Sequence, residues 1–378
     1  MGGLSRAALA LALSVAVQPP GLAVAAERQP TAILIEADSG RALREAEADA
    51  SRPLGSLGQL MLLLVSLEQA ELGLLRLQVP VTLGTAAVSP GAGGFRVPLH
   101  AEKAYLFSDL LKAVAVASAT DAAVAAAEAM AGSLPACLDL MNARALRLGM
   151  RATHYTSVGG IDGGDATTLE TTTARDQARL AQALLHHPTV LEWASATGVP
   201  FDEGAVVLRN GNQLLGAVRG VDGLQASSVR ANQSTSYSVV ATARRDALRL
   251  VVIVLDAPDT ASRYSTAADL LEWGFAHYER IELVRHGEPV NLPVRVLHGS
   301  VPQLTPIAGG TLSLLRQRND ERDLQLRYQL PVTVDAPLKR HQAVGEVIVE
   351  EKGQLIAVIP LLSPTSVSAT GVLDVDLP

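Results

Sequence analysis

Hydrophobic and polar positions change their period several times along the chain, and each period predicts an element. The run "PTAILIEADSGRAL" at 30–43 alternates and then reaches Asp38-Ser39-Gly40, which predicts a strand followed by a hairpin turn. The middle of the chain is rich in Ala and Leu at helical spacing, so we expect helices there that are buried on more than one side. The predicted helices lie at about 56–72, 106–131, 134–148 and 173–187.

Strand patterns return after these helices. "AVVLRN" at 205–210 reads as a strand, and "SYSVVATARRD" at 236–246 with "LRLVVIVLDA" at 248–257 predicts an antiparallel pair joined by a polar turn. One more helix is expected at about 262–278. The stretch "VSPGAGGFRVPLHAEK" at 88–103 contains several Gly and Pro residues and predicts an exposed flap or rim.

From about residue 284 the pattern changes to short alternating runs separated by Pro and Gly. Examples are "PVRVLHG" and "AVGEVIVEEKGQLIAVIPLLS". Such runs are typical of all-β domains. We therefore predict one domain of helices and antiparallel strands at 27–283 and a small all-β domain at 284–378.

Composition limits the classes of function. The chain has 378 residues, a net charge of −7 and no basic cluster, which argues against a nucleic-acid or anionic-membrane partner. Of its 31 basic residues only four are lysines, so few positions could supply a catalytic lysine. These are Lys103, Lys112, Lys339 and Lys352.

The first 26 residues have the features of a secretory signal. Arg6 precedes the apolar stretch Ala7–Val17, and small residues follow up to a cleavage point near Ala25-Ala26. No later apolar run is long enough to span a bilayer, so we expect a secreted or periplasmic protein. Cys137 is the only cysteine, which excludes a disulfide framework and predicts a packing role for its side chain.

The stretch "PLGSLGQLMLLL" at 53–64 places a serine directly before a long apolar helix. Ser56 and Gln59 fit the capping box, in which a serine and the residue three positions later satisfy free backbone N–H groups. A serine at a helix N-terminus can equally be a nucleophile. The residues of this stretch alone leave both interpretations open.

Several phrases, in order and with matching spacing over about 30–362, resemble the secreted serine D-alanyl-D-alanine carboxypeptidases, which are low-molecular-weight penicillin-binding proteins. They include "ILIEADSGRAL", "MNARALRLGMRATHYTSVGGID", "TTARDQARLAQALL", "LRNGNQLL" and "LLEWGF". The resemblance implies an α/β fold of the α+β type. Its first domain would be β-lactamase/transpeptidase-like, with an antiparallel sheet, covering helices and a helical lobe, and an all-β domain would follow.

The resemblance also implies a nucleophile. The family's first motif is Ser-x-x-Lys, whose serine attacks the D-Ala-D-Ala carbonyl while the lysine, on the same helix face, takes the proton. Matching the motif to this chain places the nucleophile at Ser56 and puts Gln59 where the lysine would be. A glutamine side chain cannot accept a proton near neutral pH.

The other two motifs are altered as well. Ser-x-Asn, which helps to pass the proton and binds substrate amide, corresponds to Ser118-Ala119-Thr120, so the proton-shuttle serine is kept and the asparagine is not. Lys-Thr-Gly, which contacts the substrate carboxylate, corresponds to Gln225-Ala226-Ser227. Ser228 follows, and its N–H together with the Ser56 N–H could form an oxyanion hole. These positions are the expected substrate-binding residues.

Three functional hypotheses follow. The first is a pseudoenzyme that keeps the fold, has lost efficient carboxypeptidase activity, and binds peptidoglycan stem peptides or envelope proteins. The second is a serine carboxypeptidase with residual activity, in which a water or a carboxylate activates Ser56. The third assigns function to the β domain and makes the first domain a spacer. The sequence indicates no cofactor and no metal spacing, and we expect no amphipathic membrane anchor in the segment up to Pro378.

Overall fold

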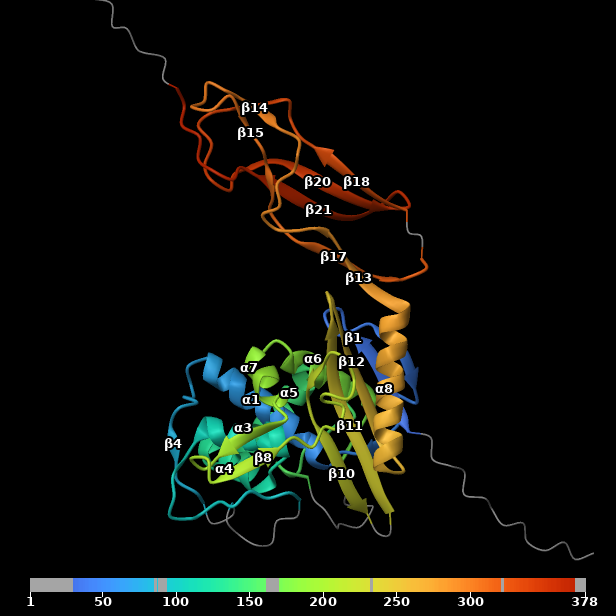
Figure 1. Cartoon of the computed structure of the whole chain (residues 1–378). Helices are drawn as coiled ribbons and strands as arrows, with labels where there is room; N and C mark the ends of the chain where they lie inside the picture. Colours follow the sequence, from blue (N-terminus) through green and yellow to red (C-terminus); the bar gives the residue numbers. More distant parts are fainter. Residues whose placement is uncertain are drawn as a thin grey trace, which may run out of the picture.

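The computed structural model describes residues 30–84, 87, 94–160, 170–231, 234–320 and 323–370. The predicted secretory signal at 1–26 and part of the predicted rim at 88–103 lie outside these residues. The fold combines a large antiparallel sheet, a group of helices and a set of C-terminal strands, as Figure 1 shows. This arrangement confirms the predicted fold class.

The large sheet has six strands in the order β10-β11-β12-β1-β2, with β9 beside β11. All its pairs are antiparallel, and Arg245 lies opposite Leu248 at the turn of the predicted β11–β12 hairpin. The strands are β1 (Thr31–Glu36), β2 (Ala42–Ala46), β9 (Val221–Gly223), β10 (Ala226–Ala231), β11 (Ser234–Arg245) and β12 (Leu248–Ala257). Both predicted hairpins are therefore confirmed.

Strand β1 is buried on both faces because helices cover the sheet from both sides (Figure 1). Ile33 and Ile35 belong to the core shared with the helical lobe, and Leu34 belongs to the core under α8 (Thr260–His277). Successive side chains of a strand point to opposite faces, so one run of apolar residues serves both cores. This explains why β1 and β12 contain continuous apolar sequence.

The helical lobe surrounds α1, which is buried from Gln59 to Leu67. The predicted helix at 106–131 is wrong as a single element, because Ser118 adopts φ 53° and ends α3 before α4 begins. The predicted helix at 173–187 ends at Leu184, and Pro188 opens a separate helix. The helices are α1 (Gln59–Glu71), α3 (Phe107–Ala117), α4 (Thr120–Ala131), α5 (Leu134–Arg147), α6 (Ala174–Leu184) and α7 (Pro188–Ala194).

Cys137 lies on α5 and is fully buried in the core of the helical lobe. Burial raises the pKa of its thiol to about 12, so the thiol stays protonated at neutral pH. The packing role predicted for this cysteine is confirmed.

Among the described helices, none is by itself long and apolar enough to cross a membrane, and the pair α4 and α5 meets that criterion only together, with an 87° bend.

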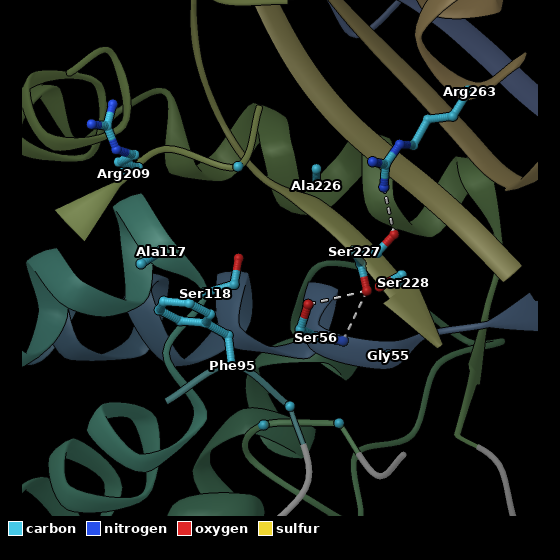
Figure 2. Close-up of a pocket in the computed structure, with 14 residues that line it drawn as sticks. Gly55, Ser56, Phe95, Ala117, Ser118, Arg209, Ala226, Ser227, Ser228 and Arg263 are labelled. Carbon is cyan, nitrogen blue, oxygen red and sulfur yellow. Dashed lines mark hydrogen bonds between the residues drawn. The ribbon is translucent and has the colours of Figure 1, made fainter. Parts of the chain in front are cut away.

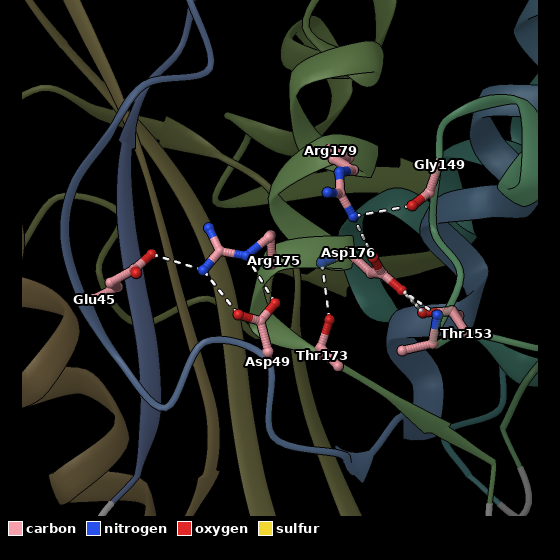
Figure 3. A network of polar contacts seen from close by, with 9 residues as sticks. Glu45, Asp49, Gly149, Thr153, Thr173, Arg175, Asp176 and Arg179 are labelled. Atoms are coloured by element: carbon pink, nitrogen blue, oxygen red, sulfur yellow. Dashed lines mark hydrogen bonds and ion pairs between the residues drawn. The ribbon is translucent and has the colours of Figure 1, made fainter.

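Polar contacts fix the N-terminus of α6 against the neighbouring loops, as Figure 3 shows. Thr173 caps the helix by accepting the Asp176 N–H at 3.1 Å. Arg175 donates to both carboxylate oxygens of Asp49 and to Glu45, which lies on β2. The hydrogen bond from Arg175 lowers the pKa of the exposed Asp49 carboxyl. These contacts hold the N-terminal end of α6 beside the sheet.

Three short strand pairs support the lobe: β3 (Arg52–Pro53) with β6 (Thr171–Thr172), β4 (Pro80–Val81) with β5 (Tyr105–Leu106), and β7 (Gly198–Phe201) with β8 (Val206–Arg209). The β4–β5 and β7–β8 pairs are joined by stacking of Tyr105 on Phe201, with ring centroids 5.6 Å apart. Lys103 forms an ion pair with Asp202 beside this stack. The described part of the rim is therefore attached to the β7–β8 hairpin.

The C-terminal strands continue directly from α8 and extend away from the large sheet (Figure 1). Arg280 on the first of them donates to the fully buried Glu36 at 2.8 Å and so ties these strands to the end of β1. They are β13 (Tyr278–Val284), β14 (Val294–Leu297), β15 (Gln303–Leu304), β16 (Ile307–Ala308), β17 (Leu312–Gln317), β18 (Leu324–Gln329), β19 (Thr333–Asp335), β20 (Ala343–Glu351) and β21 (Gln354–Leu362). The predicted boundary at 284 falls on the last residue of β13, and it stays a prediction.

Candidate active site

A cavity of about 510 Å³ opens between the helical lobe and the β10 edge of the sheet. Five of the predicted site residues line it: Ser56, Ser118, Ala226, Ser227 and Ser228 (Figure 2). The structure therefore brings together three segments that are far apart in the sequence. Predicted site residues Gln59, Thr120 and Gln225 are also close by, but they are buried beneath the cavity surface.

Ser56 lies on the 3-10 turn η1 (Gly55–Gly58), which precedes α1. Its hydroxyl is not a helix cap: it lies 3.1 Å from Ser227 Oγ, and its backbone N–H donates to the same oxygen at 3.0 Å. Gln59 does not reach back to Ser56 and instead donates to the Ser118 carbonyl. The capping-box interpretation is therefore wrong, because the side chains of both residues are used for contacts with other segments.

The start of β10 approaches η1 with alternate residues. Gln225, Ser227 and Val229 are buried, whereas Ser228 and Arg230 are exposed. This alternation is the two-residue period of a strand. Gly55 has φ 53°, and a side chain there would lie 2.0 Å from Val229 Cγ2 and 2.7 Å from Ser227 Oγ. Only glycine permits such close contact between η1 and the sheet edge.

Two glutamine amides join the three segments below the cavity. Gln225 Nε2 donates to Gln59 Oε1 at 2.9 Å and to Ser118 Oγ at 2.7 Å. Gln59 Nε2 donates to the Ser118 carbonyl at 3.2 Å. The two glutamines are 0% and 2% exposed. The network carries no charge and none of its members titrates near neutral pH.

Thr120 lies behind the cavity wall, at the first position of α4. Its N–H donates to the Phe95 carbonyl at 2.7 Å, which holds the described part of the rim against the lobe. Its side chain packs against Gly94 and Gly159, where an added Cβ would meet it at 2.4 and 2.5 Å. Thr120 therefore touches the backs of two glycines that line the cavity, and it does not itself line the cavity.

Two arginines that the sequence analysis missed also line the cavity, on opposite sides in Figure 2. Arg263 donates to the Ser227 and Ser238 carbonyls at 2.7 and 3.1 Å, and burial lowers the pKa of its guanidinium. The side chain of Arg209 is exposed and forms no hydrogen bond or ion pair with another described residue. A charged residue on the inner face of α8 was the available signal for Arg263, and Arg209 lies within the family phrase "LRNGNQLL".

The described lining contains no lysine, histidine or carboxylate. Lys112 is paired with Asp109 at 3.1 Å, and Lys103 is paired with Asp202 at the rim. The other two lysines, Lys339 and Lys352, lie in the loops between C-terminal strands. Within the described part of the chain, the cavity is therefore positively charged and has no side chain that could act as a base at neutral pH.

The loop at 156–160 supports the Ser56 backbone. Glu170 accepts the N–H and the hydroxyl of Ser157, at 2.5 and 2.9 Å, and Ser157 Oγ accepts the Gly160 N–H at 3.0 Å. Gly160 has φ 77° and packs on η1: a Cβ there would lie 2.4 Å from the Gly55 carbonyl carbon and 2.8 Å from Ser56 N. This chain of contacts fixes the position of Ser56.

We expect Gly160→Ala to lower the free energy of unfolding by at least about 2 kcal/mol, because it adds a backbone clash to the strain of a positive φ. Gly149→Ala is the matched control, since Gly149 has φ 74° but nothing within 4 Å of an added Cβ. It should lose only about 1 kcal/mol. Urea unfolding of both variants measures the difference, and equal losses would show that Gly160 does not contact η1 as described.

Comparisons with known proteins place the fold among the penicillin-binding proteins. Penicillin-binding protein 5 of Haemophilus influenzae superposes with a TM-score of 0.65 and 25% identity, covering 93% of this chain and 99% of that one. Penicillin-binding protein D2 of Listeria monocytogenes, in its ampicillin-bound form, covers 65% of this chain and 96% of that one, with 30% identity and a TM-score of 0.56.

Residues 14–259 match the profile of the D-alanyl-D-alanine carboxypeptidase family, and residues 278–369 match that of the C-terminal domain of penicillin-binding protein 5. The chain belongs to the D-alanyl-D-alanine carboxypeptidase family. D-alanyl-D-alanine carboxypeptidase DacC of Escherichia coli is 29% identical over 345 residues, which are 90% of this chain and 84% of that protein. DacF of Bacillus subtilis is 23% identical over 92% of this chain and 87% of that protein. The resemblance inferred from the sequence is thus confirmed.

Proposed function

We propose that this chain is an exported D-alanyl-D-alanine carboxypeptidase homologue that binds the D-alanyl-D-alanine end of peptidoglycan stem peptides and has lost efficient cleavage. One observation carries the proposal. The two positions that would hold the family's lysines are Gln59 and Gln225, and they are joined to Ser118 in an uncharged hydrogen-bond network.

The chemistry explains why this network matters. In cleavage, Ser56 Oγ would form a bond to the peptide carbonyl carbon while its proton passes to a base, giving an oxyanion. The C–N bond would then break, the leaving D-Ala nitrogen would take a proton, and water would hydrolyse the resulting ester. A carboxamide cannot accept the first proton, and general-base catalysis is worth roughly 10²–10⁴ in rate.

Binding places different demands on the cleft, and the described residues meet them. A peptide that ends in D-Ala carries a carboxylate, and the cavity is lined by two arginines, Arg209 and Arg263, and by no described acidic residue. Charge-assisted hydrogen bonds to a guanidinium are stronger than neutral ones. Export is supported by the secretory signal predicted at 1–26 and would place the protein in the compartment that contains peptidoglycan.

Benzylpenicillin provides the test, because it acylates an activated serine and leaves a stable mass increase. We expect the purified mature protein to show no adduct in its intact mass after long incubation, and no release of D-alanine from diacetyl-Lys-D-Ala-D-Ala. Calorimetric titration with the same peptide should still detect binding. A Ser56→Ala variant and a circular dichroism spectrum serve as controls for site and folding.

The alternative is a carboxypeptidase with residual activity, as the names of its relatives suggest. It is favoured by the Ser56 hydroxyl, which still lines the cavity. An adduct that maps to Ser56, or D-alanine release that disappears in Ser56→Ala, would establish this alternative and overturn the loss of cleavage. Absence of both adduct and peptide binding would overturn the proposed peptide binding and would favour envelope proteins as partners of the C-terminal strands.

A further inference from the structure

We propose that the Ser227 hydroxyl fills the oxyanion position of the cleft and keeps the carbonyl oxygen of an acyl substrate out of it. The inference rests on the proposed function, since it concerns the same site, but it adds a second and independent cause for the loss of cleavage. Restoring the missing bases would then not be enough to restore full reactivity.

The geometry at Ser56 carries this proposal. An oxyanion hole consists of N–H groups placed 2.7–3.1 Å from the oxygen on which negative charge develops. The N–H of the nucleophile position, Ser56, already donates to an oxygen at 3.0 Å, and that oxygen is Ser227 Oγ (Figure 2). A substrate oxygen could use this N–H only after the Ser227 hydroxyl had moved away.

The sequence explains where this oxygen comes from. Ser227 occupies the position that corresponds to the glycine of the Lys-Thr-Gly motif, and glycine has no side chain to place there. Ser227 is 4% exposed and points toward η1 as one of the buried residues at the start of β10. A single substitution at this position therefore puts a hydroxyl group against the nucleophile's amide.

Contacts on both sides hold the Ser227 hydroxyl in place. The residue pairs with Ser238 in the β10–β11 ladder, and its carbonyl accepts a hydrogen bond from Arg263 at 2.7 Å. Its Oγ also accepts a hydrogen bond from the Ser56 hydroxyl at 3.1 Å. The same oxygen thus engages both the amide and the hydroxyl that an acyl substrate would need.

The experiment removes this oxygen in a background that has bases. Benzylpenicillin acylation is followed by intact mass in Gln59→Lys/Gln225→Lys and in the same double variant with Ser227→Ala added. We expect the added change to speed acylation by at least about 100-fold, the effect typical of one oxyanion-hole donor. Ser236→Ala is the matched control: its hydroxyl is buried and has no partner among the described residues, and it lies on the neighbouring strand.

The outcomes separate the two proposals. If the double variant reacts and Ser227→Ala changes nothing, the oxyanion proposal is overturned while the loss of bases remains the explanation. If both variants fold but neither reacts, the oxyanion proposal is likewise overturned, because opening the site beside two lysines was not sufficient. Acylation of the unmodified protein would overturn the proposed function instead.

Two buried lysines can prevent folding, so a second measurement uses the natural glutamines. In Ser227→Ala, the Ser56 N–H loses its hydrogen-bond acceptor, and we expect its hydrogen exchange measured by NMR to become at least tenfold faster than in the unmodified protein. The Ser236→Ala control should leave that rate unchanged. Equal exchange in all three proteins would show that the Ser227 hydroxyl does not accept a hydrogen bond from the Ser56 N–H, and would overturn the proposal.

Discussion

The double variant Gln59→Lys/Gln225→Lys should be acylated by benzylpenicillin at least about 10³-fold faster than the unmodified protein, because it regains a base for Ser56. Gln225 Nε2 and Gln59 Oε1 are 2.9 Å apart, so two ammonium groups at these positions would repel each other. Burial and a neighbouring like charge both lower a lysine pKa, which leaves one amine neutral and able to take the serine proton.

Intact mass against time at several pH values measures this gain. Acylation should rise with pH as the lower of the two lysine pKa values is passed, since only the neutral amine accepts a proton. Gln59→Met/Gln225→Met is the control, because it keeps the side-chain length without supplying a base. If the lysine variant folds and reacts no faster than the methionine control, loss of the bases does not by itself explain the proposed loss of cleavage.

The second large effect is expected at the start of the C-terminal strands. Arg280→Met should lower the free energy of unfolding by about 3–5 kcal/mol, the range for breaking a buried ion pair by removal of one partner. Glu36 has no exposed surface and accepts a hydrogen bond from Arg280 Nη1 at 2.8 Å. Backbone N–H groups of Asp38 and Ser39 also donate to Glu36, but they cannot neutralise its charge.

Urea unfolding tests this expectation. Arg285→Met is the matched control, since Arg285 follows the same strand but is exposed and paired with Glu282 on the surface, where ion pairs contribute little. The double variant Arg280→Met/Glu36→Gln should regain part of the loss because the buried charge is gone. If Arg280→Met and Arg285→Met unfold alike, the pair with Glu36 does not stabilise the junction.

Local signals made much of this fold predictable. The turn at Asp38-Ser39-Gly40 and the apolar runs of β1 and β12 predicted the central hairpins, because turn residues and strand runs are properties of short segments. The family resemblance likewise predicted one site for Ser56, Ser118 and Gln225, and the structure places them close together. These parts depended on residues that are close in the sequence or on a family pattern.

The errors have a common physical origin. The residues around Ser118 favour a helix, but in the structure Ser118 adopts a positive φ and ends α3. The sequence of Ser56 and Gln59 matches a capping box, yet their side chains bond to Ser227 and Ser118. Packing between distant segments decides whether a side chain makes a local or a distant contact. A short stretch of sequence carries no information about that packing.

The buried thiol of Cys137 has a consequence for measuring motion in the helical lobe. It is the single cysteine of the chain, it is inaccessible in the core, and its raised pKa suppresses the reactive thiolate. A thiol reagent can therefore modify the protein only while α5 separates from the rest of the lobe. The rate of that modification therefore reports how often the helical lobe, which borders the cleft, opens. No label has to be engineered into the chain.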